Sequence, residues 1–377
     1  FMKNECMGLI NLDSIQNPSV NVLSDHRPVA TIPIAGRYRL IDFTLSNMVN
    51  SGITNVGIYA REKYRSLTDH LGSGKDWDLS RKQGGLYVLS PENAKNNNNY
   101  GYRKGDIYTI LANIDYIEKS PEEYVIVAPS YMLCSIDYND LLKYHKKSNN
   151  DITIVYKRVD NANKDFKNCN TLNIDKDKRV KNVGNNLNTF PSANICMDTF
   201  IMRRIDFIEC IYSIASMGTY SYIEDYIINQ LDNIQVGAYK YEGYLKCINS
   251  LKSYYEASKE FLTEEVSREL FRSNRKIFTK DKSQAPTMYG EDAEVRGSFI
   301  ATGCQIDGTV QDSTLFRKVK IGKGAVIRNS VIMQSCKIGD NVVLENVILD
   351  KNVTISSNKE LKGDKDYPMV IEKNETV

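Results

Sequence analysis

The chain has 377 residues, of which 41% are hydrophobic and 25% are charged, so it can bury a large core and is long enough for two domains. Lysine and arginine number 49 against 47 acidic residues, which gives a formal net charge of +2. So even a balance argues against a general nucleic-acid binder held by phosphate contacts, and the expected partners are small molecules or proteins.

The eight cysteines are scattered along the chain, with no CxxC pair and no tight cluster. This spacing favours reduced, mostly buried thiols in a cytoplasmic protein over a disulfide framework or a zinc site. No apolar run approaches the roughly 18 to 20 residues of a membrane span, and the N-terminal FMKNECMGLI has no signal-peptide pattern. We therefore expect a cytoplasmic protein that binds no membrane.

In the first half, short apolar runs alternate with segments of helical period. A strand is expected at residues 7–12, followed by a helix whose apolar face includes Ile41 and Leu45 and which Gly52 ends. The next expected elements are a strand at 55–60, a helix at 107–117, and strands at 124–128 and 151–159. Strands separated by helices predict an α/β fold with a mostly parallel sheet covered on both faces.

The segment after the first expected strand lacks the residues that hold phosphate groups. The chain has no glycine between Gly8 and Gly36, and no lysine or arginine between Lys3 and Arg27. A loop that cradles a triphosphate needs glycines, so that backbone N–H groups can approach the phosphates, and a cation to balance the charge. The sequence therefore predicts that this segment binds no triphosphate.

The last part of the chain has a different period. An offset of 17 residues sets the segment from Ile321 over the segment from Ile338, with Ile355 opening a further turn. Apolar positions coincide in this alignment, and Gly322 falls over Gly339. Short strands with Ile-Gly corners at this period are typical of a β-solenoid, and we expect a left-handed β-helix with an earlier coil at 306–316. An ordinary array of β-hairpins is the alternative.

Several stretches, in order, resemble bacterial glucose-1-phosphate adenylyltransferase, also called ADP-glucose pyrophosphorylase. They occupy residues 27–53, 72–93, 102–106, 127–138, 192–202 and 244–262. The resemblance covers essentially the whole chain. It implies a Rossmann-like nucleotidyltransferase domain at 1–248, a helical linker at 249–285 and a left-handed parallel β-helix at 286–377. In this family, ATP and glucose 1-phosphate give ADP-glucose and pyrophosphate for glycogen synthesis.

Family chemistry depends on a magnesium ion, and the resemblance implies that this chain has lost the ligands. Tyr131 and Cys247 occupy the positions of the two metal-binding aspartates. Magnesium prefers hard, usually anionic oxygen ligands, and neither a phenol nor a thiol replaces a carboxylate well. Asn185 and Asn186 occupy the positions of the Glu-Lys pair that binds the sugar phosphate. We therefore expect no catalytic residues, no metal site and no cofactor.

Four separate losses at one centre predict a chain with little or no activity of its own. It resembles the D-type regulatory subunit of this enzyme in Gram-positive bacteria, which implies assembly with a catalytic subunit in a hetero- or homo-oligomer and modulation of that partner. Two other hypotheses stay open. One is an active sugar-phosphate nucleotidyltransferase with altered metal or substrate use, and the other is a stand-alone sugar-phosphate sensor.

Some residues suited to ligand binding survive. Arg27, Arg37 and Arg39 could hold an anionic effector, because guanidinium groups bind phosphate in a bidentate fork, or they could pair with Asp42 and other carboxylates to brace the sheet. Family members are controlled by phosphorylated metabolites, which makes such a metabolite the expected effector. The resemblance also implies a residual nucleotide pocket, and the glycines that would line it are Gly84, Gly85 and Gly105. Glycine pairs are also common in simple turns.

Overall fold

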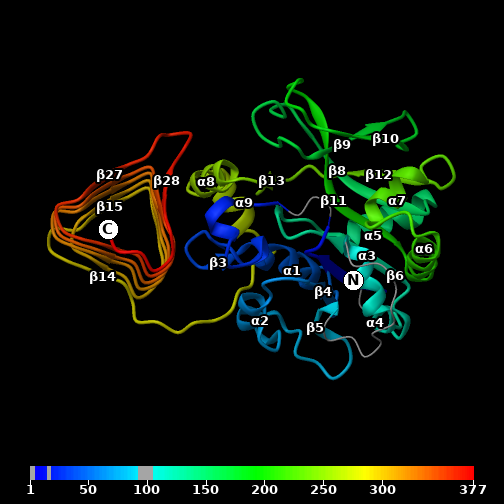
Figure 1. The fold of residues 1–377 in the computed structure, drawn as a ribbon, viewed down its shortest axis with the longest axis horizontal. Coiled ribbons are helices and arrows are strands. Elements are labelled where there is room, and N and C mark those ends of the chain that lie inside the picture. Colours follow the sequence, from blue (N-terminus) through cyan, green and yellow to red (C-terminus); the bar gives the residue numbers. More distant parts are fainter. Residues whose placement is uncertain (1–4, 15–17, 92–104) are drawn as a thin grey trace. The chain divides into compact units, whose positions relative to one another are not determined.

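The computed structural model describes residues 5–14, 18–91 and 105–377, and these residues form two compact units (Figure 1). Unit 1 contains the described residues within 1–18, together with 41–247 and 274–278. Unit 2 contains residues 19–40, 248–273 and 279–377. The predicted domain boundaries at 248 and 285 stay predictions. None of the helices in the described part of the chain combines the length and the apolar content needed to cross a bilayer.

Unit 1 is built on a mixed sheet with the strand order β10-β9-β11-β6-β1-β4-β5, to which β8 and β12 are added beside β11. Its strands are β1 (Cys6–Asn11), β4 (Asn55–Tyr59), β5 (Gly85–Leu89), β6 (Tyr124–Ala128), β8 (Ile152–Val159), β9 (Asn170–Ile174), β10 (Val180–Asn185), β11 (Ala193–Arg203) and β12 (Val236–Lys240). The neighbours β6, β1, β4 and β5 are parallel, as are β8 and β12. The predicted parallel sheet is confirmed. Strand β11 departs from it, because it runs antiparallel to both β6 and β8.

Helices cover both faces of this sheet. They are α1 (Leu40–Asn50), α2 (Arg65–Leu71), α3 (Gly105–Ala112), α4 (Ile114–Glu118), α5 (Tyr138–Ser148), α6 (Arg204–Met217) and α7 (Ile223–Asn229). On one face, Leu9 of β1 belongs to the same buried cluster as residues of α3 and α6. On the other face, a Cβ added to Gly8 would lie 2.5 Å from Met48 Sδ of α1, so close helix packing requires this glycine.

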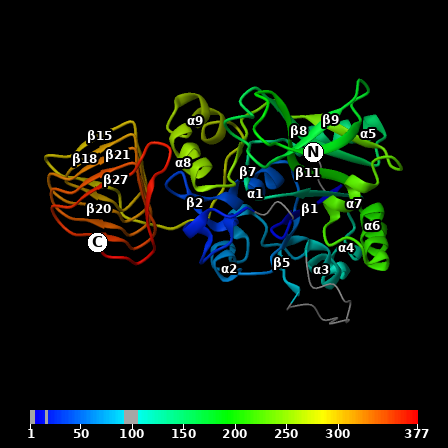
Figure 2. The same cartoon turned by 45° about the horizontal axis from the view of Figure 1, so that its top comes forward.

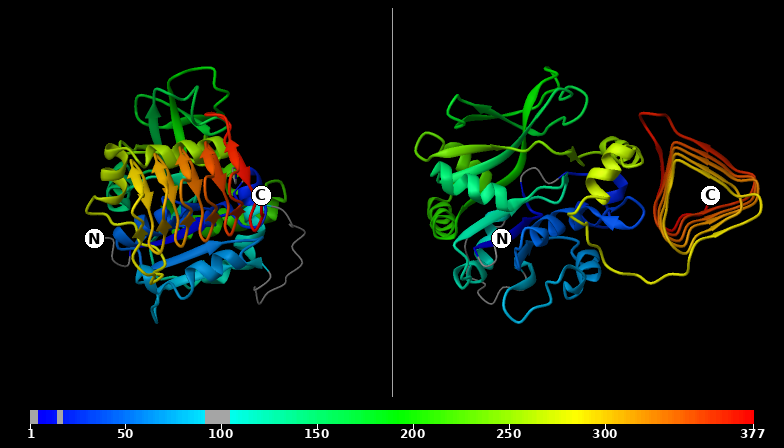
Figure 3. Two further views of the ribbon diagram at one scale, coloured as in Figure 1. Left: turned by 90° about the vertical axis from the view of Figure 1, so that its left-hand side faces the viewer. Right: turned by 180° about the vertical axis from the view of Figure 1, so that it is seen from behind.

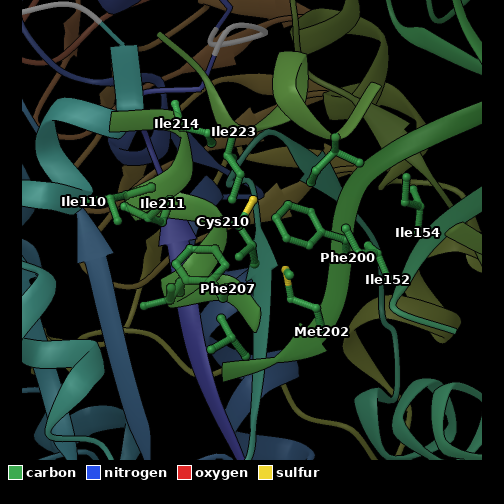
Figure 4. Packing of buried hydrophobic residues seen from close by; sticks show 14 of the residues in the cluster. Ile110, Ile152, Ile154, Phe200, Met202, Phe207, Cys210, Ile211, Ile214 and Ile223 are labelled. Atoms are coloured by element: carbon green, nitrogen blue, oxygen red, sulfur yellow. The ribbon is translucent and has the colours of Figure 1, made fainter. Parts of the chain in front are cut away.

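The core of unit 1 is apolar and tightly filled (Figure 4). Phe207 and Ile211 of α6 lie over the sheet, where Phe200 and Met202 of β11 meet them, and each of these side chains is at least 95% buried. Cys210 lies in the same cluster. All eight cysteines of the chain are buried and none forms a disulfide, in agreement with the expected thiols.

Unit 2 is a β-helix whose triangular coils stack along one axis (Figures 1 and 2). Each coil contributes one short strand to each of three parallel sheets. The first sheet contains β14 (Met288–Tyr289), β17 (Gln305–Ile306), β20 (Lys320–Ile321), β23 (Lys337–Ile338) and β26 (Thr354–Ile355). The second contains β15 (Glu294–Arg296), β18 (Thr309–Gln311), β21 (Val326–Arg328), β24 (Val343–Glu345) and β27 (Glu360–Lys362). The third contains β16 (Phe299–Ile300), β19 (Thr314–Leu315), β22 (Val331–Ile332), β25 (Val347–Leu349) and β28 (Met369–Ile371).

The predicted 17-residue register is the register of the solenoid. Ile321 pairs with Ile338, and Ile327 pairs with Leu344, each in a parallel ladder. The expected coil at 306–316 is present as β17, β18 and β19, and the parallel pairing excludes the hairpin array. One further coil at 288–300 was not predicted. Its spacing to the next coil is 17 residues at Tyr289 but 15 residues at Val295, so no single offset finds it.

Two helices of the predicted linker pack within unit 2. They are α8 (Leu251–Glu260), which begins with a capping box at Ser250, and α9 (Glu264–Phe271). Tyr254 Oη donates a hydrogen bond of 2.7 Å to the carbonyl of Pro33 in β2 (Pro33–Ile34), which pairs with β3 (Tyr38–Arg39). Tyr255 Oη donates to the carbonyl of Asn329 at a solenoid corner. Helix α8 thus connects the segment 19–40 to the β-helix.

Candidate functional site

Tyr131 and Cys247, the two residues at the expected metal positions, come together in unit 1. Tyr131 follows β6 and precedes β7 (Met132–Leu133), and β7 pairs in antiparallel fashion with β13 (Lys246–Cys247). The register sets Cys247 opposite Met132, the residue next to Tyr131. Both side chains are buried, each with 3% exposure. Strand pairing therefore brings together two positions that are more than one hundred residues apart in the sequence.

Neither of these two side chains suits a magnesium ion. Burial raises the pKa of Tyr131 well above its ordinary value, so the phenol stays protonated at neutral pH. A hydrogen bond with Cys169 and burial together raise the pKa of Cys247, so the thiol stays protonated as well. Magnesium binds anionic or carbonyl oxygens. Across the described ranges, no group of three or more His, Cys, Asp or Glu side chains is arranged to hold a metal ion.

Two buried carboxyl groups lie beside Tyr131. Asp198 accepts hydrogen bonds from Tyr131 Oη at 3.0 Å and from Asn170 Nδ2 at 3.4 Å. It stands at a bulge of β11 with a φ of 48°, which turns its side chain toward these donors. Burial raises the pKa of Glu224, and repulsion from Asp198 raises it further. Glu224 Oε2 is buried without a hydrogen-bond partner, so the two carboxyl groups interact unfavourably when both are ionised.

The segment that follows β1 also faces carboxyl groups. Asn11 Nδ2 donates a hydrogen bond of 2.7 Å to Asp106, and Thr109 Oγ1 donates one of 3.1 Å to Asp13. Burial raises the pKa of Asp106 to about 7 and also raises the pKa of Asp13. A triphosphate placed beside these groups would meet negative charge where phosphate binding needs cations and N–H donors. Residues 15–17 of this segment lie outside the described part of the chain.

The two asparagines at the sugar-phosphate positions hold a loop together. Asn186 is buried, and its Nδ2 donates to the carbonyl oxygens of Ala162 and Phe166 at 2.7 and 2.8 Å. Asn185, at the end of β10, is exposed and donates to the carbonyl of Asn168 at 3.2 Å. The hydrogen-bonding capacity of Asn186 is therefore used by the chain itself.

The three glycines expected in a nucleotide pocket each have a local structural reason. Gly105 opens α3 with a φ of 74°, and a Cβ there would lie 2.0 Å from the carbonyl oxygen of Ser221. Gly84 and Gly85 both have positive φ, and their Cβ atoms would lie within 3 Å of the carbonyl oxygens of Thr54 and Leu79. Backbone packing therefore accounts for all three. Residues 102–104 of the family-like YRKGD stretch lie outside the described residues.

The three arginines have different surroundings in unit 2. Arg27 is buried, forms an ion pair with Asp350, and donates from Nε to the carbonyl of Leu23 at 2.8 Å. Arg37 is exposed, and its Cζ lies 5.5 Å from the ring centroid of Tyr38. Arg39 is half-buried on β3. In unit 1, Asp42 Oδ1 lies 2.6 Å from Nε2 of His70.

Arg39 lies among cations that sequence reasoning missed. Burial lowers the pKa of Lys351 to about 7, and the charges of Arg39 and Arg27 lower it further, while Asp350 acts in the opposite direction. Burial and the charges of Arg39 and Arg317 lower the pKa of Lys282. We call Arg39, Lys282, Arg317 and Lys351 the cationic cluster. Like charges that weaken one another's protonation are stabilised when an anion binds among them.

Comparisons with known proteins agree with this architecture. Residues 22–183 match the nucleotidyl transferase family model, and residues 284–367 match the GlmU-like, C-terminal hexapeptide model. The chain is 33% identical to the glycogen biosynthesis protein GlgD of Bacillus subtilis (strain 168) and 37% identical to that of Geobacillus stearothermophilus, and each match covers 99% of this chain and 97% of the relative. It is 28% identical to the glucose-1-phosphate adenylyltransferase of Clostridium novyi (strain NT), over 87% of this chain and 85% of the relative.

Proposed function

Because the chain belongs to the GlgD family of glycogen biosynthesis proteins, we propose that it is a regulatory subunit of glucose-1-phosphate adenylyltransferase without catalytic activity of its own. Its role in glycogen biosynthesis follows from the family. The non-catalytic role is the step that this proposal adds. The partner would be a catalytic adenylyltransferase subunit, which would convert ATP and glucose 1-phosphate into ADP-glucose and pyrophosphate.

The observation that carries the proposal is the charge of the emptied centre. Attack on a phosphoryl group is catalysed by positioning and by cations that neutralise developing negative charge. Unit 1 instead places a phenol and a thiol at the two metal positions and the carboxyl group of Asp198 3.0 Å from the phenol. The segment after β1 adds Asp13 and Asp106. This arrangement disfavours both the substrate triphosphate and the transition state.

The regulatory role is supported by the cationic cluster of unit 2. Lys351 is largely buried beside Arg39 and Lys282, which is an unfavourable arrangement that a bound anion would relieve. A phosphate ester is an anion with the charge and the acceptor oxygens to do this. We propose a phosphorylated metabolite as the effector. Arg27 contributes through its charge, because its guanidinium is already paired with Asp350.

The experiment is an assay of ADP-glucose formation with Mg²⁺, using the purified chain alone and mixed with a catalytic adenylyltransferase. The chain alone is expected to give no metal-dependent product. In the mixture, the activation or inhibition of the partner by phosphorylated metabolites is expected to change. Robust turnover by the chain alone that disappears in Tyr131→Phe or Cys247→Ala would contradict the proposal.

The effector site is tested separately in the same mixture. Lys351→Gln removes one cation of the cluster, and Lys337→Gln removes an exposed lysine elsewhere on the solenoid as a matched control. We expect Lys351→Gln to weaken the response to phosphorylated metabolites while the rate without effector stays the same. An unchanged response in Lys351→Gln, or an equal loss in both variants, would show that the cluster binds no effector.

A further inference from the structure

The two ends of the β-helix differ in how they are closed. At the C-terminal end, Val377 donates from its backbone N–H to the carbonyl of Thr354 and accepts from Ser356, at 3.0 and 2.8 Å. The Val377 side chain packs against the solenoid core, and Ile355 beneath it is only 1% exposed. The last residues of the chain therefore cap this end, and both views along the axis show the C-terminus inside the triangular outline (Figures 1 and 3).

The other end of the solenoid is formed by the first coil, shown in yellow on the side of the stack in Figure 3. Strands β14, β15 and β16 each stand last in their sheets, so within the described residues no strand pairs with their outer edges. Tyr289 and Val295 are in register with Ile306 and Val310, which are 1% and 0% exposed. Tyr289 is itself 56% exposed and Val295 is 38% exposed. The apolar column of the solenoid is thus open to solvent at this end.

The backbone of this first coil is ready to pair with another strand. Glu294 N–H donates to the carbonyl of Gly308, and the carbonyl of Arg296 accepts from Asp312, so both residues direct their backbone groups toward the second coil. Because these groups alternate along a strand, the N–H and C=O of Val295 point away from the solenoid. Open strand edges combined with exposed apolar side chains are a surface for strand pairing with another chain.

The charges on β15 select the partner and the register. If two copies of β15 pair in antiparallel fashion about Val295, then Glu294 of each copy lies opposite Arg296 of the other. A shift of the register by two residues sets Glu294 against Glu294 or Arg296 against Arg296. Opposite charges directly across an antiparallel pair are favourable and like charges are unfavourable. The sequence Glu-Val-Arg is therefore complementary to itself in one register.

We propose that the open end of the β-helix is an interface with a second copy of this chain, related by a twofold axis that passes through β15. A twofold axis at this place pairs β15 with its own copy and sets β14 of each copy against β16 of the other, since it exchanges the other two sides of the triangle. All three open edges are then closed at once, and Tyr289 and Val295 are covered. This interface is independent of the proposed catalytic partner.

Sedimentation of the full-length chain over a concentration series tests the proposal. The wild-type chain is expected to form dimers as the concentration rises. Arg296→Glu and Glu294→Arg each place like charges opposite one another twice per interface, and each is expected to weaken dimerisation by about tenfold or more. The double variant Glu294→Arg/Arg296→Glu restores opposite charges in the same register, and is expected to return dimerisation to within about threefold of the wild type.

Two further variants distinguish the edge from the rest of the solenoid. Val295→Pro removes the N–H that points outward, so dimerisation should be lost while the far-UV circular dichroism stays the same. Lys337→Glu changes an exposed charge on an inner coil and should leave dimerisation unchanged. A wild-type chain that stays monomeric at all concentrations, or a double variant without rescue, would overturn the proposal. A chain that is monomeric alone and pairs only with a catalytic adenylyltransferase would also overturn it, because the occupant would then be a different protein.

Discussion

Asp106 is a single buried carboxyl group that links three parts of unit 1. It accepts hydrogen bonds from Asn11 Nδ2 in β1 and from the backbone N–H of Ile223 at the start of α7, and it stands in the first turn of α3. Burial raises its pKa from 3.8 to about 7. The folded chain therefore holds a proton on Asp106 at pH values where the unfolded chain has already released it.

The stability of unit 1 should depend on pH through this residue. A folded-state pKa above the unfolded value contributes stability that is present below pH 3.8 and is lost as the pH rises through about 7. We expect the wild-type free energy of unfolding to fall more between about pH 5 and pH 8 than that of Asp106→Asn, which does not titrate. Urea unfolding of both chains at the two pH values measures the difference. Parallel pH profiles of the two chains would contradict the assignment.

Lys351 gives a second pH dependence, this time in ligand binding. Its pKa of about 7 means that it is partly neutral near physiological pH, and an anion bound beside it would raise that pKa. Binding of a sugar phosphate should therefore take up protons and strengthen as the pH falls from about 8 to 7. Calorimetry in buffers of different ionisation enthalpy measures this proton uptake. Lys351→Gln should abolish the uptake, and an uptake that survives in this variant would assign it to another group.

At the residue scale, the sequence identifies the losses better than it identifies the new contacts. Tyr131 and Cys247 could be found because they replace a residue type within recognisable motifs, and the structure brings both to the β7–β13 pair. Asp198, Glu224 and Lys351 could not be found, because burial and neighbouring charges make them unusual and neither property is visible in a linear motif. Arg27 shows the same limit, since its partner Asp350 is 323 positions away.

At the scale of elements, a regular repeat makes the solenoid the most predictable part of the chain. Residues in corresponding positions stack on one another, so the 17-residue offset predicts contacts as well as strands. The same regularity explains what was missed. The first coil departs from the offset by two residues, and β11 reverses direction within a sheet whose other pattern indicated parallel strands.

The stacking predicts where an apolar deletion costs most. Ile327 points into the solenoid and is 0% exposed, whereas its neighbour Val326 is on the outer side and only half-buried. Ile327→Ala should lower the free energy of unfolding by about 2–5 kcal/mol, because it leaves a cavity between coils. The matched variant Val326→Ala should lose about 1 kcal/mol or less. Equal losses, measured by chemical denaturation, would show that the coils do not depend on their inner column.

At the scale of the whole molecule, both fold classes were predictable, since each is marked by its own hydrophobic period over a long segment. The arrangement of unit 2 was not, because residues 19–40 and 248–273 join the β-helix from distant parts of the sequence. Tyr254 and Tyr255 make these connections through hydrogen bonds to Pro33 and Asn329. Such contacts leave no local periodicity.

Removal of residues 374–377 tests the C-terminal cap. The deletion would expose Ile355 and open the backbone edge at Thr354, which pairs with Thr376 in the intact chain. A chain with two open ends should form assemblies larger than a dimer, measured by light scattering. Val377→Ala keeps the backbone hydrogen bonds and should retain the wild-type size. A truncated chain with the wild-type size distribution would show that the tail is dispensable as a cap.

The asymmetry between the two ends limits how far such association can go. Stacked β-solenoids with two adhesive ends would add subunits without limit and grow into fibrils, a hazard for any cell that makes them in quantity. Here the four residues at the C-terminus act as a terminator of polymerisation. Pairing through the remaining end stops at two subunits, so a repetitive and inherently sticky architecture yields a particle of defined size.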